Sequence, residues 1–173
     1  MSDATRVPVL PAIDFELAES FSNNQRWMVG WFPPDAVPDG VNHGASGVCL
    51  TPEGDCVLIT ADGTSWDLPG GRPENGETLE ETLCRELMEE ACVEVTSARL
   101  LGFARAECIE GSELGLVIVR SIWHAQVALL DWDPHWETTA RQLVPVSDAV
   151  AAIGLIDGLG RVIARAITEA TTT

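Results

Sequence analysis

The sequence predicts an α/β protein in which a mixed β-sheet is flanked by helices. Segments rich in β-branched and apolar residues occur at 26–32, 44–51, 55–60, 98–110 and 114–130, and helical patterns occur at 78–91 and 158–170. The strands and helices do not alternate strictly, which favours a mixed sheet with helices packed against it. The 173 residues are enough for a single domain with a substantial buried core.

The first part of the chain combines a leading segment with several short strands. Residues 1–20 contain scattered proline and the amphipathic stretch IDFELAESF, which predict an arm or a short helix, and residues 21–173 are expected to form one domain. The stretch RWMVGWF predicts a strand that ends at the loop PPDAVPDG. GASGVCLT and DCVLIT predict a hairpin around PEG. ADGT is typical of a turn, and WDLP of a short strand.

The second part contains the two long helices. The segment from Thr78 to Ala91 predicts a helix because it is rich in Leu, Glu, Met and Arg and contains no Gly or Pro. ARLLGFARAECIE and LGLVIVRSIWHAQVALL predict strands on either side of a GSE turn, and WETTARQLVPV predicts a final strand or extended segment. Ser147 is expected to cap a short helix, DAVAAIG. The last helix has an apolar face: Leu159, Val162, Ile163, Ala166 and Ile167.

The charge of the chain limits its partners. Its formal net charge is −17, from 27 acidic and 10 basic residues. Such a surface repels a phosphate backbone, so we expect no nucleic-acid partner. It attracts divalent cations, and an anionic substrate would need a metal ion as a bridge. No apolar run approaches the ~20 residues that span a bilayer, so we expect no membrane insertion.

The cysteines indicate a reducing compartment. The five cysteines show no CxxC spacing, which favours buried free thiols in a cytoplasmic protein. The start of the chain has no secretory signal pattern, which agrees with a cytoplasmic location. One alternative remains at this stage. If TPEG forms a four-residue hairpin turn, Cys49 and Cys56 lie opposite each other and could form a cross-strand disulfide.

The helix at 78–91 carries a cluster of carboxylates. On a helical wheel, Glu86, Glu89 and Glu90 fall within an arc of about 100°. This arc adjoins the apolar stripe, where water is scarce and like charges repel more strongly. A bound hard cation such as Mg²⁺ would compensate the charge. A solvated acidic face with pairs such as Glu81–Arg85 is the alternative, and spacing alone leaves both open.

The acidic helix and the loop before it resemble the signature of the Nudix hydrolases. That signature reads G, five residues, E, seven residues, then R-E-U-x-E-E-x-G-U, where U is aliphatic. The matching positions are Gly71, Glu77, Arg85, Glu86, Leu87, Glu89, Glu90 and Val93. One position departs, because Cys92 stands where the family has glycine. A left-handed backbone is often needed there, so this departure affects how the helix ends.

The resemblance implies a fold, a reaction and a set of site residues. The fold would be a Nudix-type α/β/α sandwich with a loop–helix–loop catalytic motif. The reaction would be hydrolysis of a pyrophosphate bond in a nucleoside diphosphate linked to another moiety, by attack of water on phosphorus with Mg²⁺ or Mn²⁺. Glu86 and Glu90 would be metal ligands, Glu89 a further ligand or the general base, and Gly70 would offer its carbonyl to the metal. Glu77 and Arg85 would orient the other residues.

Residues outside the signature complete the set of candidates. Some family members take their general base from elsewhere, and the sequence does not choose among Glu107, Glu110, Glu113 and Glu137. Arg72, Trp27 and Trp31 are candidates for substrate binding. The two tryptophans share one face of a strand, where core packing or a dimer contact is more frequent than base stacking.

Three functions compete at this point. The first is hydrolysis of a small-molecule nucleotide substrate. The second is a non-catalytic nucleotide-sensing domain of the same fold, against which the intact Glu86, Glu89 and Glu90 argue. The third is an acidic protein whose glutamate helix binds a basic partner. By analogy with the family, the protein could be a homodimer.

Overall fold

The computed structural model describes residues 17–135 and 137–172. The strands are β1 (Ala18–Ser22), β2 (Gln25–Phe32), β3 (Val41–Leu50), β4 (Asp55–Thr60), β5 (Gly70–Gly71), β6 (Val93–Glu110), β7 (Val117–Leu129) and β8 (Ala140–Pro145). The helices are α1 (Leu79–Ala91), α2 (Ala149–Ile153) and α3 (Gly158–Thr171), and a 3₁₀ turn, η1 (Val146–Asp148), precedes α2.

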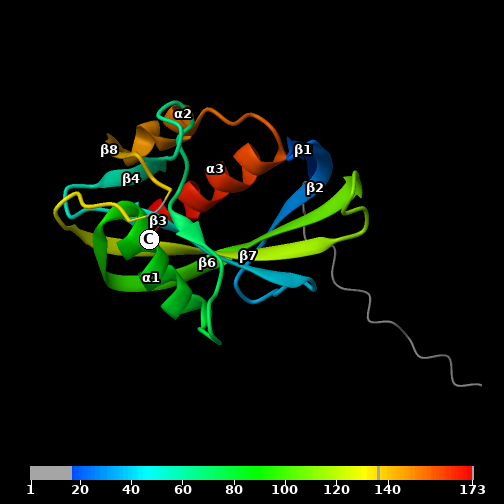
Figure 1. Ribbon diagram of the computed structural model, residues 1–173, viewed down its shortest axis with the longest axis horizontal. Helices are drawn as coiled ribbons and strands as arrows, with labels where there is room; N and C mark the ends of the chain where they lie inside the picture. Colours follow the sequence, from blue (N-terminus) through cyan, green and yellow to red (C-terminus); the bar gives the residue numbers. More distant parts are fainter. Residues whose placement is uncertain (1–16, 136, 173) are drawn as a thin grey trace, which may run out of the picture.

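All of these strands belong to one mixed sheet. Their order is β1-β2-β6-β7-β3-β4-β8, and β5 pairs with β3 beside this path. Strands β3 and β7 are parallel, whereas the other pairs are antiparallel. Helices α1 and α3 pack against opposite faces of the sheet (Figure 1). The predicted mixed sheet between helices is therefore confirmed.

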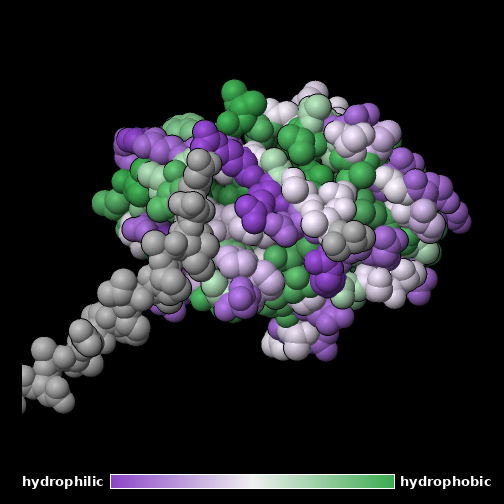
Figure 2. All heavy atoms as spheres, turned by 180° about the vertical axis from the view of Figure 1, so that it is seen from behind, coloured by the Kyte–Doolittle hydropathy of each residue, from purple (hydrophilic) through white to green (hydrophobic). Residues whose placement is uncertain are grey.

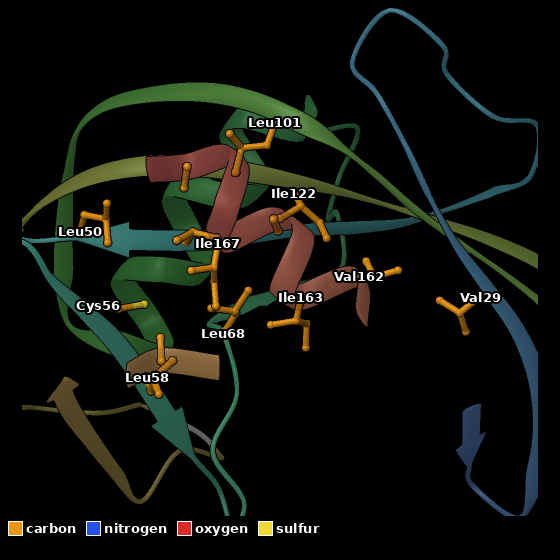
Figure 3. Close-up of a cluster of buried hydrophobic side chains, with 14 of the residues drawn as sticks. Val29, Leu50, Cys56, Leu58, Leu68, Leu101, Ile122, Val162, Ile163 and Ile167 are labelled. Carbon is orange, nitrogen blue, oxygen red and sulfur yellow. The ribbon is translucent and has the colours of Figure 1, made fainter. Parts of the chain in front are cut away.

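Each face of the sheet has its own buried core. On the α3 side, Val162, Ile163 and Ile167 lie in one buried cluster with strand residues such as Val29, Leu50 and Ile122 (Figure 3). On the α1 side, the core contains fully buried residues of the helix: Leu83, Leu87 and Ala91. Apolar burial on both faces fixes the position of α1, which carries the acidic cluster.

Local sequence determines where α1 begins. Thr78 is the N-cap and accepts a hydrogen bond from the backbone N–H of Glu81, whose side chain accepts one from the backbone N–H of Thr78. This capping box satisfies two N–H groups that a helix start leaves without partners. The predicted helix is confirmed. It also has the predicted relation between its faces, because the glutamates adjoin the buried leucines.

Strands β3 and β4 separate soon after the turn that joins them. They pair at Leu50 and Cys56, and beyond that point the segment 67–71 fills the space between them. Asp67 forms a bridge with Ile59 on one side, and β5 pairs with Ala45 and Ser46 on the other. The backbone N–H of Gly47 also donates to the carbonyl of Pro69. The loop before α1 is thus bound to both strands.

Several local expectations differ from the structure. Residues 1–16 lie outside the described residues, but Ala18–Ser22 is a strand paired with β2, so neither an arm nor a helix forms there. The α2 segment has Asp148 at its N-cap position and no side-chain cap, so Ser147 does not cap it. Ser147 instead donates to the Asp148 carboxylate. The WDLP segment forms a single bridge, and the short strand lies just after it.

The cysteines are free thiols. Cys56 lies opposite Leu50, and Cys49 points into the core on the α1 side whereas Cys56 points into the other core. The cross-strand disulfide considered as an alternative is therefore absent. This follows from the pleat of the strands, in which neighbouring residues face opposite sides of the sheet.

The surface mixes polar and apolar residues. On the face in Figure 2, hydrophobic areas are broken up by hydrophilic ones. Within the described part of the chain, no helix has the length and apolar character needed to cross a bilayer.

Candidate active site

Arg85 is the centre of a network of ion pairs on α1. Its Nε and Nη2 atoms donate to the two oxygens of Glu77, at 2.7 and 3.0 Å. Its Nη1 donates to Glu86 at 3.0 Å and to Glu89 at 3.3 Å. The Nη2 atom also donates to the carbonyl of Arg72. The guanidinium therefore links the loop before the helix to two of the clustered carboxylates.

Glu77 fixes the orientation of that guanidinium. Its carboxylate also accepts from the backbone N–H of Glu74 and from the hydroxyl of Thr82. The hydrogen bonds from Arg85 lower the pKa of Glu77 to about 2. A bidentate carboxylate–arginine pair of this kind is strong and directional. The structure thus joins Glu77, Arg85, Glu86 and Glu89 in one hydrogen-bonded network.

Glu86 and Glu90 lie one turn apart on α1 and both contact β5. Glu90 accepts a hydrogen bond from the backbone N–H of Gly70 at 3.0 Å. A Cβ at Gly71 would overlap the carboxylate of Glu86, and one at Gly70 would lie 2.6 Å from the Ser46 hydroxyl. Position 70 therefore needs glycine, whereas a side chain at position 71 would have to displace the Glu86 carboxylate. This close approach places two carboxylates and the Gly70 backbone around one small region.

Burial weakens the ionisation of Glu90. Desolvation, with the nearby Glu86 charge, raises the pKa of Glu90 to about 7, although the Gly70 N–H opposes this shift. The Glu86 side chain is 13% exposed, whereas that of Glu89 is 34% exposed. Crowded carboxylates in a partly dry site favour either protonation or a bound cation.

The oxygen donors fit a hard divalent cation. Among the described residues, no group of three or more His, Cys, Asp or Glu side chains lies close enough together to hold a metal ion on its own. Mg²⁺ does not require such a group, because it is usually held by one or two carboxylates and completes its shell with waters and phosphates. Glu86, Glu90 and the Gly70 carbonyl are the groups that could hold such an ion in an open arrangement.

The end of α1 is held by an arginine from a distant strand. Nη1 of Arg141 on β8 donates to the carbonyls of Ala91 and Cys92, both at 2.8 Å. Nη2 donates to the carbonyl of Leu130, and the guanidinium lies 5.3 Å from the centroid of the Trp132 ring. A cation at a helix C-terminus complements the helix dipole. Arg141 thus fixes the helix end that carries Glu89 and Glu90.

Cys92 ends α1 in a left-handed conformation, with φ 51° and ψ 54°. Its backbone N–H still donates to the carbonyl of Met88, and its Sγ accepts from the backbone N–H of Asp133 at 3.4 Å. The helix therefore ends as a glycine would end it, although cysteine is less stable in this conformation. Cys92 thus adopts the left-handed conformation that the glycine of the signature favours.

A pocket of about 570 Å³ lies on the α3 side of the sheet, and one of its lining residues, Arg120, senses the charges of Glu86 and Glu90 through space. Its apolar wall includes Trp27, Val29, Ile122 and Ile163, and its polar groups include Asp67, Arg72, Glu113 and Arg120. A pocket with an apolar wall and a few polar groups is typical of a small-molecule site. It is large enough for a nucleoside.

The chain was also compared with known proteins. The family model described as NUDIX domain matches residues 41–165. The chain belongs to the Nudix hydrolase family.

Individual Nudix relatives agree with this assignment. A stretch of 39 residues is 49% identical to the 8-oxo-dGTP diphosphatase of Proteus vulgaris, covering 22% of this chain and 35% of that protein. A mutant of the Bacillus subtilis pyrophosphohydrolase BsRppH is similar in structure, with a TM-score of 0.57 and 27% identity over 68% of this chain and 72% of that one. The MutT protein of Methanosarcina mazei Go1 has a TM-score of 0.57 and 17% identity, over 79% and 100%.

The two aliphatic positions of the Nudix signature have structural roles. Leu87 and Val93 are fully buried in the core on the α1 side. They anchor the acidic helix and the start of β6, so that the intervening glutamates stay at the edge of the core.

The substrate-binding candidates are placed differently from one another. Trp27 and Arg72 line the pocket. Trp31 does not line it and instead packs against the α3-side core, with its ring close to Gly102. Among the candidates for an external base, Glu113 lines the pocket, while Glu107 and Glu110 form ion pairs with Arg105 and Arg26. Glu137 is exposed.

Sequence reasoning missed three polar residues of this Nudix site: Asp67, Arg120 and Arg141. Arg120 had a visible signal, since it is the one charged residue in the apolar stretch LGLVIVRSIWHAQVALL. An arginine in a strand that is otherwise apolar usually has a specific partner or role. Arg141 had no such signal, because its partners come from a distant part of the chain, and Asp67 gave none, because among the described residues its side chain bonds only to the neighbouring Leu68 N–H.

Proposed function

We propose that this chain hydrolyses a pyrophosphate bond in a nucleoside diphosphate linked to another moiety, in a Mg²⁺-dependent reaction. The observation that supports this most strongly is the convergence of Glu86 and Glu90 on β5. Oxygen donors in an open arrangement beside a pocket suit a metal that must also bind phosphates. The named relatives, a diphosphatase and a pyrophosphohydrolase, support the same reaction class.

Each site residue has a proposed role. Glu86, Glu90 and the Gly70 carbonyl would hold the metal, and Glu89 would be a further ligand or the base. Bound Mg²⁺, or Mn²⁺ with the same oxygen ligands, would neutralise phosphate charge and orient the attacking water. Arg85 keeps Glu86 and Glu89 in place, and Glu77 keeps Arg85 in place.

Glu89 is the proposed general base. It would accept a proton from water as the oxygen of that water bonds to phosphorus and the bond to the bridging oxygen breaks. Its side chain is the most exposed of the carboxylates paired with Arg85, so water can reach it. Glu113 is the alternative, because it lines the pocket, where its carboxylate accepts a hydrogen bond from Gln25.

The pocket would hold the nucleoside. Trp27 supplies a flat apolar wall and Arg72 a cation at the side of the carboxylate cluster. Trp31 would act only through the packing behind this wall. The free cysteines support the expected reducing cytoplasm. The homodimer stays a prediction.

A substrate panel tests the proposal. Phosphate, pyrophosphate and nucleotide products would be measured for nucleoside triphosphates and for nucleoside diphosphates linked to a second moiety, with Mg²⁺ and with EDTA. Wild type should act only with the metal, and Glu90→Gln should reduce turnover at least ~100-fold. Glu80→Gln is the matched control, because Glu80 is exposed on the same helix. Equal activity of Glu90→Gln and wild type would rule out the assigned ligands.

The competing functions predict other results. A sensor domain would bind a nucleotide without turning it over. An acidic docking protein would show neither binding nor turnover. Comparing Glu89→Gln with Glu113→Gln distinguishes the two candidate bases, since only loss of the true base should remove the acidic limb of the pH–rate profile.

A further inference from the structure

Arg120 is a pocket residue whose charge has no direct partner. Its Nη1 donates to the hydroxyl of Ser46 and its Nη2 to the carbonyl of His43, both at 3.1 Å. Both acceptors are neutral. No ion pair joins Arg120 to a carboxylate of residues 17–135 or 137–172, and the charges of Asp67, Glu90 and Glu86 act on it only through space.

Arg85 provides a direct contrast. That guanidinium forms ion pairs with three carboxylates of the same region. Arg120 has three further N–H donors, and burial lowers its pKa, which shows that its surroundings disfavour the charge. A desolvated cation without a paired anion is destabilising unless a ligand completes it. The arrangement therefore indicates a site for an acceptor that the protein itself does not supply.

The position of Arg120 defines which part of a substrate it can reach. Its partner Ser46 packs against Gly70, the residue whose N–H contacts Glu90. The guanidinium therefore contacts the Ser46 hydroxyl, and that hydroxyl lies beside Gly70 of β5. From there the pocket continues along the α3 side of the sheet to Trp27 and Ser20. Arg120 therefore lines the pocket and is also within electrostatic range of Glu86 and Glu90.

We propose that Arg120 binds the phosphoryl group to which the organic moiety of the substrate is attached. This inference rests on the proposed function, because it takes the pocket as the site of that moiety. If a phosphoric anhydride extends from β5 into the pocket, the phosphoryl group that carries the organic moiety lies beside Arg120. The planar guanidinium can donate two parallel hydrogen bonds to phosphate oxygens, which a point charge cannot do.

A purely structural role would give Arg120 a different setting. An arginine that only balances Asp67 and Glu90 would be expected to form an ion pair with one of them, as Arg85 does with Glu77. Its hydrogen bonds to Ser46 and to the His43 carbonyl instead fix the orientation of the guanidinium. Such prior orientation reduces the entropy lost when a ligand binds.

Equilibrium binding without metal tests the proposal. The probes are AMP, GMP, CMP and UMP, each compared with its own nucleoside, titrated by calorimetry in EDTA. For the base that binds best, wild type should prefer the monophosphate by about 10- to 100-fold, as expected for hydrogen bonds to a charged group. Arg120→Gln should remove this preference and leave nucleoside affinity unchanged.

Two further variants control for charge and folding. Arg165→Gln makes the same charge change at an exposed ion pair on α3 and should keep the full preference. Arg120→Lys should keep only part of it, because the ammonium group lacks the planar fork. If Arg120→Gln does not fold, Arg120→Lys replaces it in the experiment. Its preference for the monophosphate over the nucleoside should then be at least about threefold smaller than that of wild type.

The proposal is overturned if Arg120→Gln keeps the preference for the monophosphate, or if wild type shows none. Neither measurement involves metal or turnover. A protein that binds as expected but hydrolyses nothing with Mg²⁺ would refute the proposed reaction and leave the role of Arg120 standing. If wild type hydrolyses nucleotides with Mg²⁺ but Arg120→Gln does not change monophosphate binding, the proposed reaction stands and the role of Arg120 is refuted.

Discussion

The backbone of Gly71 lies directly against the carboxylate of Glu86, with no room for a side chain between them. Residue 71 is in a strand and has no positive φ, so alanine there meets no backbone strain. We expect Gly71→Ala to displace the Glu86 carboxylate and to lower Mg²⁺ affinity and kcat/KM by about 10- to 100-fold, as changes next to metal ligands do. Metal titration and steady-state kinetics measure both effects.

The melting temperature of the metal-free Gly71→Ala protein is the control. Because the overlapping group is the far end of a flexible side chain, it should move with little loss of stability. Unchanged Mg²⁺ affinity in a folded Gly71→Ala protein would show that Glu86 does not bind the metal where it lies in this structure.

Glu90→Gln should stabilise the metal-free protein at alkaline pH. Burial raises the pKa of Glu90 from 4.5 to about 7, so the folded state holds this proton more tightly than the unfolded state. Its contribution to stability is present below about pH 4.5 and is lost as pH rises through about 7. The substitution should therefore add about 1–2 kcal/mol at pH 8, after allowance for partial exposure, and much less at pH 4.

Urea unfolding in EDTA at both pH values measures this difference. Glu80→Gln, at an exposed position on the same helix, should show no comparable pH dependence. A Glu90→Gln protein that is less stable than wild type at pH 8 would contradict the expectation. The gain in stability should accompany a loss of metal binding, since a site for a cation is strained without it.

The left-handed Cys92 gives a comparison between two substitutions. Cys92→Gly and Cys92→Ala both lose the thiol and its contact with the Asp133 N–H. Only glycine adopts this φ without strain, so Cys92→Gly should be more stable than Cys92→Ala by about 1 kcal/mol. Thermal unfolding of the two proteins measures the difference. Equal stabilities would mean that the helix end relaxes to another conformation in the alanine protein.

Arg141 should be important for stability although it lies far from the signature in sequence. Arg141→Met keeps most of the apolar stem but removes three hydrogen bonds to backbone carbonyls. We expect a loss of roughly 1.5–3 kcal/mol, because these bonds involve a charged donor. Arg165→Met, which breaks an exposed pair with Glu169, should lose less than about 1 kcal/mol. Chemical denaturation would show whether the two losses differ.

The sequence was most informative where structure depends on near neighbours. The helix from Leu79 to Ala91 follows from helix formers and the Thr78–Glu81 capping box. The buried face of α3 follows from apolar residues at helical spacing: of the five predicted residues, Val162, Ile163, Ala166 and Ile167 are buried and Leu159 is partly buried against them. The spacing of Glu86 and Glu90 likewise determines that both side chains lie on one side of α1.

Contacts between distant residues could not be predicted in this way. Arg141 binds the carbonyl of Ala91 across 50 positions, and Arg120 donates to Ser46 across 74. These contacts depend on the sheet order, in which β7 lies beside β3 and β8 beside β4. The prediction that Ser147 caps α2 was wrong because the Ser147 hydroxyl donates to the Asp148 carboxylate instead. Residue type alone does not show which of two local hydrogen bonds will form.

The segment 67–71 acts as a wedge that closes the gap between two strands. This segment is hydrogen-bonded to Ile59 on β4 and to Gly47 on β3, so separating either strand from the sheet also breaks the contacts of the segment. Opening of this part of the sheet would at the same time detach Gly70 from Glu90. Local unfolding that spares the remainder of the sheet would therefore disrupt the proposed metal site, so loss of metal binding during denaturation would report on the opening of this part of the sheet.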